Sequence, residues 1–377
     1  MKIAIVGTRG VPASYGGFET FAEELGRRLS DRGHEVTVYG RPGFVDPELG
    51  TYLGMKLVVV PAIRSKHLET VSHTFVTSIH AVRQGFDVIL MCNAANAPFV
   101  RLLQMGGLPV ALNVDGLERN RRKWGWAGRT YYRLCERWAA RWPNAVVTDA
   151  EVIRRYYRRA YKVETTMIAY GADLPRPEGT ETLETLGVKP GEYALYVSRF
   201  EPENNPDRVA EAWVRSSTTR RLIMLGGAPY APELTQRVHA VADDRIILPG
   251  PIYGEGYRQL LFNCRLYIHA TEVGGTHPAL IEAMGAGRPV LALDTPENRE
   301  VIGSTGPVFR FEGSRALDTL ITKVLEDDDL LTTLGRETAA RAEAHYSWEA
   351  VTDAYESLLE GLSRPSHHKS TTRPNTP

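Results

Sequence analysis

The same alternation of short apolar strands and amphipathic helices occurs twice along this chain. In the first half, an apolar run at residues 3–6 ends at Gly7, and a helical pattern follows at 18–29, where apolar residues recur every three or four positions. The alternation starts again at residues 194–197. Strands that alternate with helices pair in parallel, so each half predicts a doubly wound α/β sheet. A length of 377 residues also exceeds what one hydrophobic core usually serves.

Further elements follow from the same spacing. Gly33 is expected to end the first helix as its C-terminal cap. Apolar runs predict strands at residues 36–39, 57–60, 88–91, 110–114, 221–225, 266–269 and 290–292. Helical spacing predicts helices at residues 207–214, 278–285 and 348–362.

Composition places the domain boundaries. Residues 173–191 are rich in Pro, Gly, Glu and Thr, so we expect a linker there, between Rossmann-like domains at 1–172 and 192–346. A helix at 347–362 is expected to pack back on the first domain, and residues 363–377, which lack apolar side chains, are expected to be disordered. The two domains should face each other across a cleft at the carboxyl ends of their strands, where open α/β sheets bind ligands.

The segment at residues 272–290 has the most specific pattern. It follows a predicted strand and opens a helix at Pro278, a residue that fits the first helical turn. Gly274 and Gly275 allow the backbone to approach a ligand closely. The Thr276 side chain can cap the helix or donate a hydrogen bond to the ligand. The helix start would bind a diphosphate, and Glu282, one turn in, would accept hydrogen bonds from two ribose hydroxyls. The alternative is a plain βαβ turn with a surface glutamate.

A second loop, at residues 197–206, lies between the first strand and first helix of the second domain. Arg199 is placed to form charge-assisted hydrogen bonds to a pyrophosphate, and Asn204 can donate to it. Ser198 is a weaker candidate, as are Asn298 and Glu300 near the other loops. A surface arginine beside a proline turn is the alternative.

Two loops of the first domain complete the predicted site. Gly16 and Gly17 precede a helix, where backbone amides would face a phosphate or sugar, and Tyr15 lies on the acceptor side. The loop lacks the Gly-x-Gly-x-x-Gly fingerprint, which argues against an NAD enzyme. Asp115 ends an apolar strand and should project into the cleft, with Glu118 near the acceptor; an Asp-Gly turn is the alternative for Asp115.

The motif at 272–290 resembles the donor-binding motif of family 4 glycosyltransferases, Glu-x7-Glu followed by Ala-Met-x-x-Gly-x-Pro-Val. Glu282 matches the second Glu, which holds the ribose in that family. The first Glu, which touches the transferred sugar, falls at Gly274; Glu272 is two residues out of register. Asn204 stands where the family has a phosphate-binding Lys, and Asp115 where many members have a His.

The resemblance covers most of residues 1–362 and is strongest to bacterial rhamnosyltransferases of surface polysaccharide assembly, which share Pro-Glu-Asn-Asn and the stretch from Gly7 to Thr20. It implies the two-lobed GT-B fold and a retaining transfer of a sugar from a nucleotide diphosphate donor to an acceptor sugar or lipid-linked glycan. Asp115, Arg199 and Glu282 would be catalytic. The donor site would comprise Gly16, Gly17, Arg199, Asn204, Gly274, Gly275, Thr276, His277 and Glu282.

The resemblance makes dTDP-rhamnose the first donor to consider, ahead of UDP- or GDP-sugars. No cofactor and no metal are expected, since no Asp-x-Asp occurs and His269 and His277 lack a third ligand. A GT-B sugar-nucleotide epimerase is one alternative. A catalytically silent nucleotide-sugar-binding module is another, because the first Glu and the Lys are missing. A phosphorylase would need a lysine constellation that we do not find.

The two halves of the chain differ in net charge. Residues 1–175 contain 24 Lys and Arg against 16 Asp and Glu, and residues 176–377 contain 21 against 29. The basic excess lies in residues 119–162, with 13 Lys and Arg against three acids. Arginines at every fourth position should line one helix face beside Trp124: Arg129, Arg133, Arg137 and Arg141. This pattern is typical of docking to an anionic membrane, with an ordinary solvated face as the alternative and nucleic acid a poorer third.

The cysteines and the apolar runs indicate the cellular compartment of the protein. Cys92, Cys135 and Cys264 show no disulfide or zinc spacing, which indicates reduced, buried thiols. The apolar run at the start is shorter than a signal peptide needs, and no stretch approaches the roughly 18 apolar residues of a membrane span. We therefore expect a cytoplasmic protein that contacts the inner face of the membrane peripherally.

Overall fold

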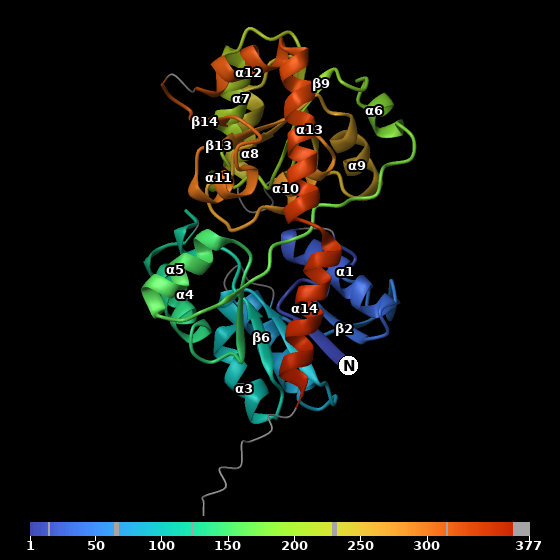
Figure 1. Cartoon of the computed structure of the whole chain (residues 1–377), viewed down its shortest axis with the longest axis vertical. Helices are drawn as coiled ribbons and strands as arrows, with labels where there is room; N and C mark the ends of the chain where they lie inside the picture. Colours follow the sequence, from blue (N-terminus) through green and yellow to red (C-terminus); the bar gives the residue numbers. More distant parts are fainter. Residues whose placement is uncertain (14–15, 64–67, 123, 228–231, 314–315, 365–377) are drawn as a thin grey trace, which may run out of the picture.

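A computed structural model shows two lobes stacked along the long axis of the molecule and joined at a narrow waist (Figure 1). It describes residues 1–13, 16–63, 68–122, 124–227, 232–313 and 316–364. The N lobe consists of residues 1–172 together with the final helix, α14 (Trp348–Ser363). The C lobe consists of residues 173–346.

The N lobe is built on an eight-stranded sheet, counted over the described residues, in the order β3-β4-β2-β1-β5-β6-β7-β8. Every pairing is parallel except that of β3 with β4. Alternate residues of β1 point to opposite faces, so Ile3 and Ile5 join one core and Ala4 and Val6 the other. The strands are β1 (Lys2–Val6), β2 (Glu35–Gly40), β3 (Thr51–Tyr52), β4 (Met55–Val59), β5 (Val88–Cys92), β6 (Val110–Asn113), β7 (Ala145–Thr148) and β8 (Thr166–Met167).

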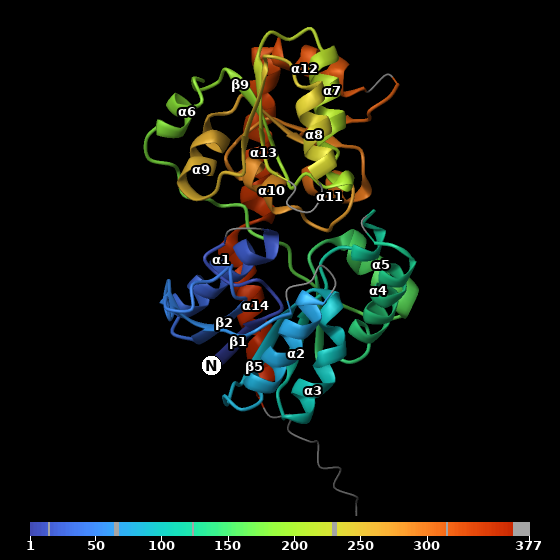
Figure 2. The same cartoon turned by 180° about the vertical axis from the view of Figure 1, so that it is seen from behind.

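Helices cover both faces of this sheet. α14 and α1 lie on one face (Figure 1), whereas α2 and α3 lie on the other (Figure 2). The first helix buries Phe21, Ala22, Leu25 and Leu29, and Gly33 follows it with φ +89°, as the sequence predicts. The helices are α1 (Gly17–Asp31), α2 (Glu69–Ala81), α3 (Val100–Met105), α4 (Trp126–Ala139) and α5 (Glu151–Tyr161).

The C lobe repeats the plan with six strands over the described residues, all parallel, in the order β11-β10-β9-β12-β13-β14. The strands are β9 (Tyr193–Val197), β10 (Arg221–Leu225), β11 (Ile246–Gly250), β12 (Leu266–His269), β13 (Val290–Leu293) and β14 (Val308–Phe309). The helices are α6 (Glu181–Thr185), α7 (Pro206–Arg215), α8 (Pro232–Val241), α9 (Gly254–Asn263), α10 (Pro278–Gly285), α11 (Pro296–Ile302), α12 (Leu317–Leu325) and α13 (Asp328–His345). The two-domain α/β architecture predicted from the sequence is confirmed.

The chain crosses between the lobes twice, and the two crossings pair with each other. The Ala172 N–H donates to the Tyr346 carbonyl at 2.7 Å, and the Trp348 N–H donates to Asp173 Oδ1 at 2.7 Å. Gly171 has no room for a side chain, because an added Cβ would overlap the Trp348 ring. Beyond this crossing, α14 packs on the N lobe, where the Tyr355 and Phe21 rings lie 5.2 Å apart.

Two sequence expectations differ from the structure. Most of the segment expected to be a linker belongs to the C lobe, because α6 packs on α9 and Gln259 bonds to Thr182 and Glu178. Arg141 lies beyond the end of α4, so the arginine row on that helix ends at Arg137. Residues 365–377, expected to be disordered, lie outside the described residues.

Candidate functional site

A cleft of about 740 Å³ lies between the lobes, at the carboxyl ends of strands from both sheets. Parallel strands end at one edge of each sheet, which is why loops distant in sequence meet here. The N-lobe loops include those after β1, β2, β5, β6 and β8, and the C-lobe loops include those after β9, β10, β11 and β12. The cleft brings together twelve residues singled out from the sequence: Gly16, Gly17, Asp115, Glu118, Trp124, Ser198, Arg199, Asn204, Gly274, Thr276, His277 and Glu282.

Other sequence candidates lie elsewhere. Gly275 is covered by the Asp149 carboxylate and does not line the cleft. Asn298 is fully buried and donates to the carbonyls of Thr271 and Leu293, so its role is structural. Arg129, Arg133 and Arg137 lie on the outer face of α4. Tyr15 is outside the described residues.

Two helix starts, one from each lobe, face each other across the cleft. Gly16 and Gly17 begin α1, and a Cβ added to Gly17 would meet Pro278, the first residue of α10, at 3.0 Å. The first turn of a helix has N–H groups without partners inside the helix, and the helix dipole makes this end positive. The part of the cleft beside these two helix ends therefore favours an anion.

Glu282 lies one turn into α10 with only 7% of its surface exposed. Its Oε2 accepts a hydrogen bond of 2.6 Å from the Tyr257 hydroxyl of α9. Burial raises the pKa of Glu282 to about 6, and the Tyr257 hydrogen bond opposes that rise. The bond leaves Oε1 as an acceptor for a ligand.

Arg199 lies in the turn after β9, with about a third of its side chain exposed. Its Nη1 is 3.7 Å from Glu201 Oε1. The Asn204 amide, expected to donate to phosphate, already donates to the Arg199 carbonyl at 2.7 Å and so fixes this turn. Arg258 of α9, which pairs with Glu255, also lines the cleft and supplies a further guanidinium that the motifs did not indicate.

Asp115 follows β6 in a left-handed conformation, with φ 55°. It both forms the turn with Gly116 and lines the cleft. Its N–H donates to Asn113 Oδ1 at 3.0 Å. Burial raises the pKa of Asp115, and Glu118 adds to the effect. Glu118 pairs with Arg121 at 2.6 Å, and Arg121 reaches across to Glu201 and Glu203 of the C lobe at 3.2 and 3.1 Å.

Further polar contacts join the lobes beside the cleft. The Thr276 N–H donates to Asp149 Oδ2 at 2.8 Å. In the opposite direction, the Glu300 carboxylate of the C lobe accepts from the first N–H groups of α5, those of Glu151 and Val152, at 2.5 and 2.7 Å. Each lobe thus supplies a carboxylate to backbone amides of the other. Glu272 is likewise occupied, because Arg122 of the N lobe pairs with it at 2.9 Å.

His277 and His269 lie side by side, with ring centroids 4.8 Å apart. Burial lowers the pKa of His277 to about 3, and it lowers that of His269 well below its usual value. Both rings are therefore neutral at pH 7. Within the described ranges, the group with metal-ligand spacing is His34, Glu356 and Glu360. His34 directly precedes β2 and the two glutamates lie on α14, so the group is not in the cleft. Metal independence stays a prediction.

The basic stretch divides into two populations. Arg119, Arg121 and Arg122 are held by carboxylates, so they do not contribute to a free surface charge. Arg154 and Arg155 are also paired, each with Glu151. Seven further basic residues are exposed, and no ion pair joins them to a carboxylate within the described part of the chain: Arg129, Arg133, Arg137, Arg141, Arg158, Arg159 and Lys162. Trp126, 83% exposed, and Leu134 lie among them.

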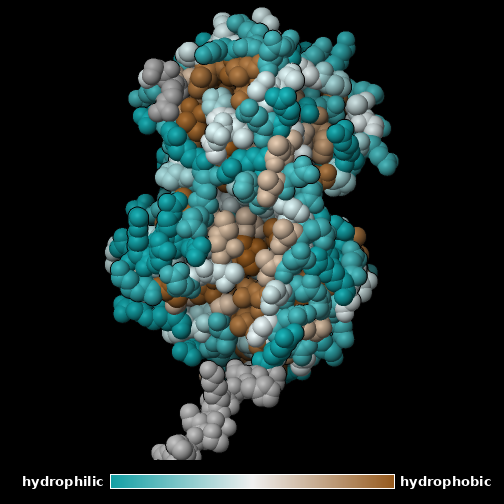
Figure 3. All heavy atoms as spheres, in the orientation of Figure 1, coloured by the Kyte–Doolittle hydropathy of each residue, from teal (hydrophilic) through white to brown (hydrophobic). Residues whose placement is uncertain are grey.

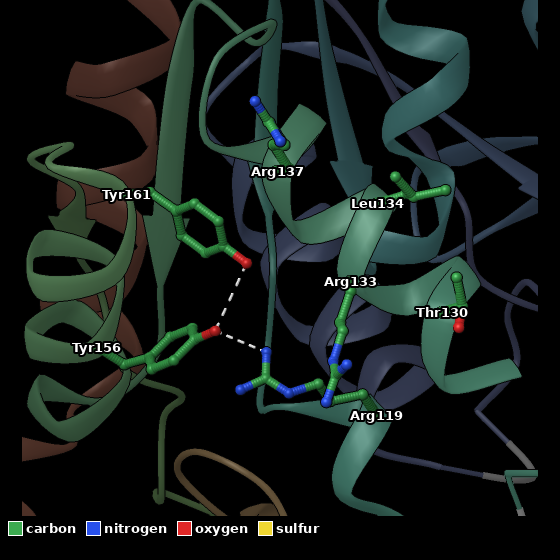
Figure 4. A pocket seen from close by; sticks show the side chains of 7 residues that line it. All are labelled: Arg119, Thr130, Arg133, Leu134, Arg137, Tyr156 and Tyr161. Carbon is green, nitrogen blue, oxygen red and sulfur yellow. Dashed lines mark hydrogen bonds between the residues drawn. The ribbon is translucent and has the colours of Figure 1, made fainter. Parts of the chain in front are cut away.

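A hollow of about 390 Å³ opens on this basic face, between α4 and α5 (Figure 4). Arg133 extends toward Arg119 at its floor, where the Tyr156 hydroxyl contacts Arg119 at 2.6 Å. Arg137 points away from that pair. The side of the N lobe where α4 and α5 lie is mostly hydrophilic (Figure 3).

Asp149, Tyr257 and Arg258 are among the residues of the site region that sequence reasoning missed. Asp149 follows β7 as Asp115 follows β6, so the same search for polar residues after parallel strands would have found it. Tyr257 and Arg258 lie on α9, where nothing in the local sequence distinguishes them from other helical residues. Their position depends on how α9 packs beside α10.

Comparison with known proteins agrees with this architecture. Residues 16–171 match the family model described as glycosyl transferase 4-like domain, and residues 191–327 match that of glycosyl transferases group 1. The two lobes with their shared cleft define a two-domain α/β protein of the GT-B type. The chain belongs to the GT-B glycosyltransferases, since the two models together span most of its length.

Individual relatives are more distant. O-antigen chain mannosyltransferase B of Escherichia coli is 25% identical over 212 residues, which is 54% of this chain and only 55% of the relative. Sucrose-phosphate synthase from Thermosynechococcus elongatus superposes with a TM-score of 0.79 at 19% identity, over 96% of this chain and 98% of that one. Anabaena HepE in complex with UDP-glucose superposes with a TM-score of 0.77 at 18% identity, over 96% of this chain and 100% of that one.

The described helices include none with both the length and the apolar character that crossing a membrane requires.

Proposed function

We propose that this chain transfers a sugar from a nucleotide diphosphate donor to an acceptor sugar or lipid-linked glycan, with retention of the anomeric configuration. The observation that supports this most is the convergence of Arg199, the start of α10 and Glu282 in one interlobe cleft. These groups match the charge of a nucleotide diphosphate: a guanidinium and helix N–H groups for the phosphates, and a carboxylate for the ribose.

The orientation of the donor follows from these positions. Glu282 and Tyr257 would hold the ribose within the C lobe, and Arg199 with Arg258 would hold the diphosphate. The sugar would then extend toward Asp115 of the N lobe. The acceptor would enter from the N-lobe side, past Glu118 and Trp124.

The chemistry is a substitution at the anomeric carbon. The bond from this carbon to the phosphate oxygen breaks, and the acceptor oxygen bonds to the same face of the sugar. The acceptor proton passes to the leaving phosphate. Arg199 and the two helix starts would stabilise the charge that develops on the diphosphate, and Asp115 would stabilise the positive charge on the sugar ring. Closure of the lobes would exclude water and limit hydrolysis. No metal enters this scheme, so transfer should persist in EDTA.

Arg199→Ala and Glu282→Ala test the proposal. Arg199→Ala removes a donor to the developing charge and should lower transfer by about 10²–10³-fold. Glu282→Ala removes the acceptor for the ribose hydroxyls and should lower transfer by weakening donor binding. Arg237→Ala, an exposed arginine of the C lobe, is the matched control and should behave like the wild type. Normal turnover by either site variant would contradict the assignment. Conversion of the donor without any acceptor would instead indicate an epimerase, and binding without turnover a silent binding module.

The identity of the donor is open to a direct screen. The resemblance to rhamnosyltransferases favours dTDP-rhamnose, the Escherichia coli relative is a mannosyltransferase, and HepE was crystallised with UDP-glucose. A ligand that binds the folded state raises its melting temperature, so a thermal-shift series over dTDP-rhamnose, GDP-mannose and UDP-glucose separates these donors. We expect the largest shift with dTDP-rhamnose.

The exposed basic face supports a lipid-linked acceptor at the cytoplasmic face of an anionic membrane. Each basic residue near an anionic lipid surface contributes about 1 kcal/mol, and the exposed Trp126 can enter the headgroup region. Replacing Arg129, Arg133 and Arg137 by Ala should therefore lower binding to phosphatidylserine vesicles by about a hundredfold. The control triple on the C lobe, Lys189, Arg237 and Arg336, should bind normally. Equal binding by both triples would remove the membrane proposal.

A further inference from the structure

Two carboxyl groups meet at the edge of the cleft. Asp115 and Asp149 follow the neighbouring parallel strands β6 and β7, in which Asn113 pairs with Val147, so the two aspartates stand at matching positions two residues further on. Asp115 lines the cleft, whereas Asp149 lies behind it and is fully buried. Asp149 therefore stands beside a residue of the proposed site without reaching the cleft itself.

Asp149 also contacts the donor loop of the other lobe. The Thr276 N–H donates to its Oδ2 at 2.8 Å, and the Thr276 hydroxyl donates to its backbone carbonyl at 2.5 Å. Gly275 must be glycine here, since an added Cβ would overlap the Asp149 carboxyl group. Asp149 is thus enclosed between the β6 loop on one side and the start of the α10 loop on the other.

A hydrogen bond between the two carboxyl groups requires a proton on one of them. Asp149 Oδ1 is fully buried, and no protein donor reaches it within the described residues. Two ionised carboxylates are acceptors only, so Asp115 and Asp149 can share a hydrogen bond only if one of them is protonated. Burial raises the pKa of Asp149 well above its usual value, and the negative charge of Asp115 raises it further. Arg121 favours the charged form of Asp115, so the proton belongs on Asp149.

We propose that Asp149 is a neutral positioning acid, whose Oδ1–H donates to the Asp115 carboxylate while its Oδ2 accepts from the Thr276 N–H. This role rests on the proposed function. One of these bonds is to the N lobe and the other to the C lobe. Asp149 would therefore orient the Asp115 carboxylate toward the donor sugar and, at the same time, hold the donor loop in place. Both bonds can form only when the lobes are closed. A protonated carboxylic acid in an apolar site can serve as such a donor at pH 7.

Several other titratable groups face the pair and belong to the same pH response. Glu118 and Arg121 act on Asp115 from the β6–α4 segment. His277, in the donor loop of the C lobe, lies near Arg121 and is neutral. The remaining groups are neutral at pH 7, because burial raises their pKa values: Cys92 on β5, Tyr170 after β8 and Tyr355 on α14.

D149N distinguishes this role from that of an ionised aspartate. Asparagine has the shape of the protonated acid: its oxygen accepts from Thr276, and its NH₂ donates to Asp115. We expect D149N to keep transfer within about threefold of the wild type at pH 7, and D149A to lose about 10- to 100-fold. Wild-type transfer should fall as pH rises through the pKa of the pair, because the lost proton leaves two adjacent anions; D149N should lack this alkaline fall. Loss of transfer in D149N as deep as in D149A, or an unchanged pH profile in D149N, would overturn the proposal.

A second measurement does not depend on activity. In the protein labelled with ¹³C at the aspartate carboxyl carbon, one signal should have the chemical shift of a protonated acid at pH 7. That signal should be absent from D149N, and in D115N it should move, because its hydrogen-bond partner changes. Ionised shifts for every aspartate would overturn the proposal. A chain that shows the protonated signal but transfers no sugar from any donor would contradict the proposed function and leave the protonated pair established.

Discussion

At the residue scale, the burial of Glu282 makes donor binding depend on pH. Its pKa is raised to about 6 by burial, so the carboxyl group is ionised at pH 7.5 and protonated at pH 5. An ionised carboxylate accepts hydrogen bonds from two ribose hydroxyls better than the neutral acid does. We therefore expect the dissociation constant of the donor, measured by titration calorimetry, to increase as pH falls through about 6.

Two variants at this position separate the cause from other acid effects. In Glu282→Gln, binding should be weaker at pH 7.5 and show no transition near pH 6. In Tyr257→Phe, the hydrogen bond that lowers the pKa of Glu282 is lost, so the transition should move to higher pH. A transition that stays near pH 6 in Glu282→Gln would show that another group controls donor binding.

At the element scale, α14 is held to the N lobe by a buried polar contact as well as by its apolar face. Asn113 Nδ2, at the end of β6, donates to the Tyr355 hydroxyl at 2.9 Å, and both residues are fully buried. Tyr355→Phe leaves this N–H without a partner, which costs about 1–3 kcal/mol. We expect the free energy of unfolding of the N lobe, measured by urea titration, to fall by that amount.

Tyr267→Phe is the matched control. Tyr267 on β12 is also fully buried, but its hydroxyl has no partner among the described groups. Removing a hydroxyl that is buried without a hydrogen bond should leave stability unchanged or increase it. Equal destabilisation by the two changes would mean that the Asn113 contact contributes nothing specific.

The elements themselves were largely predictable, because local signals control them. The strand at β10 and the helix at α10 have the bounds that apolar runs, Pro278 and Gly285 indicate. α6 was missed since its segment has the Pro and Gly content of a linker, and only contacts with Gln259 on α9 hold it in the C lobe. Local composition does not report such tertiary support.

At the scale of the whole molecule, the sequence indicated which loops meet but not how the lobes touch. Asp115, Arg199 and Glu282 lie in one cleft because each follows a parallel strand or opens the next helix, which is a topological rule. Arg121 appeared in the sequence only as one of 13 basic residues. Its pairing with Glu201 and Glu203, 80 and 82 residues away, depends on the relative placement of two domains. Charge pairs at such separation leave no local pattern.

The closed arrangement of the lobes depends on these cross-lobe charges. Arg121 is 8% exposed and Glu203 is fully buried, and they lie 3.1 Å apart. Replacing one partner of a buried ion pair leaves the other charge buried and uncompensated, at a cost of about 3–5 kcal/mol. Arg121→Ala imposes this cost on the closed form alone, since opening of the cleft returns Glu203 to water. The variant should therefore shift the population toward an open form.

Small-angle scattering tests this expectation directly. We expect Arg121→Ala to have a larger radius of gyration than the wild type and a lower rate of transfer, while each lobe stays folded by circular dichroism. Arg129→Ala should match the wild type in both measurements, because Arg129 is exposed and forms no ion pair with the C lobe among the described residues. Donor added at saturation should bring Arg121→Ala back toward the wild-type radius, because a ligand that contacts both lobes favours the closed form in proportion to its differential affinity. An unchanged radius and rate in Arg121→Ala would show that packing, rather than charge, keeps the lobes together.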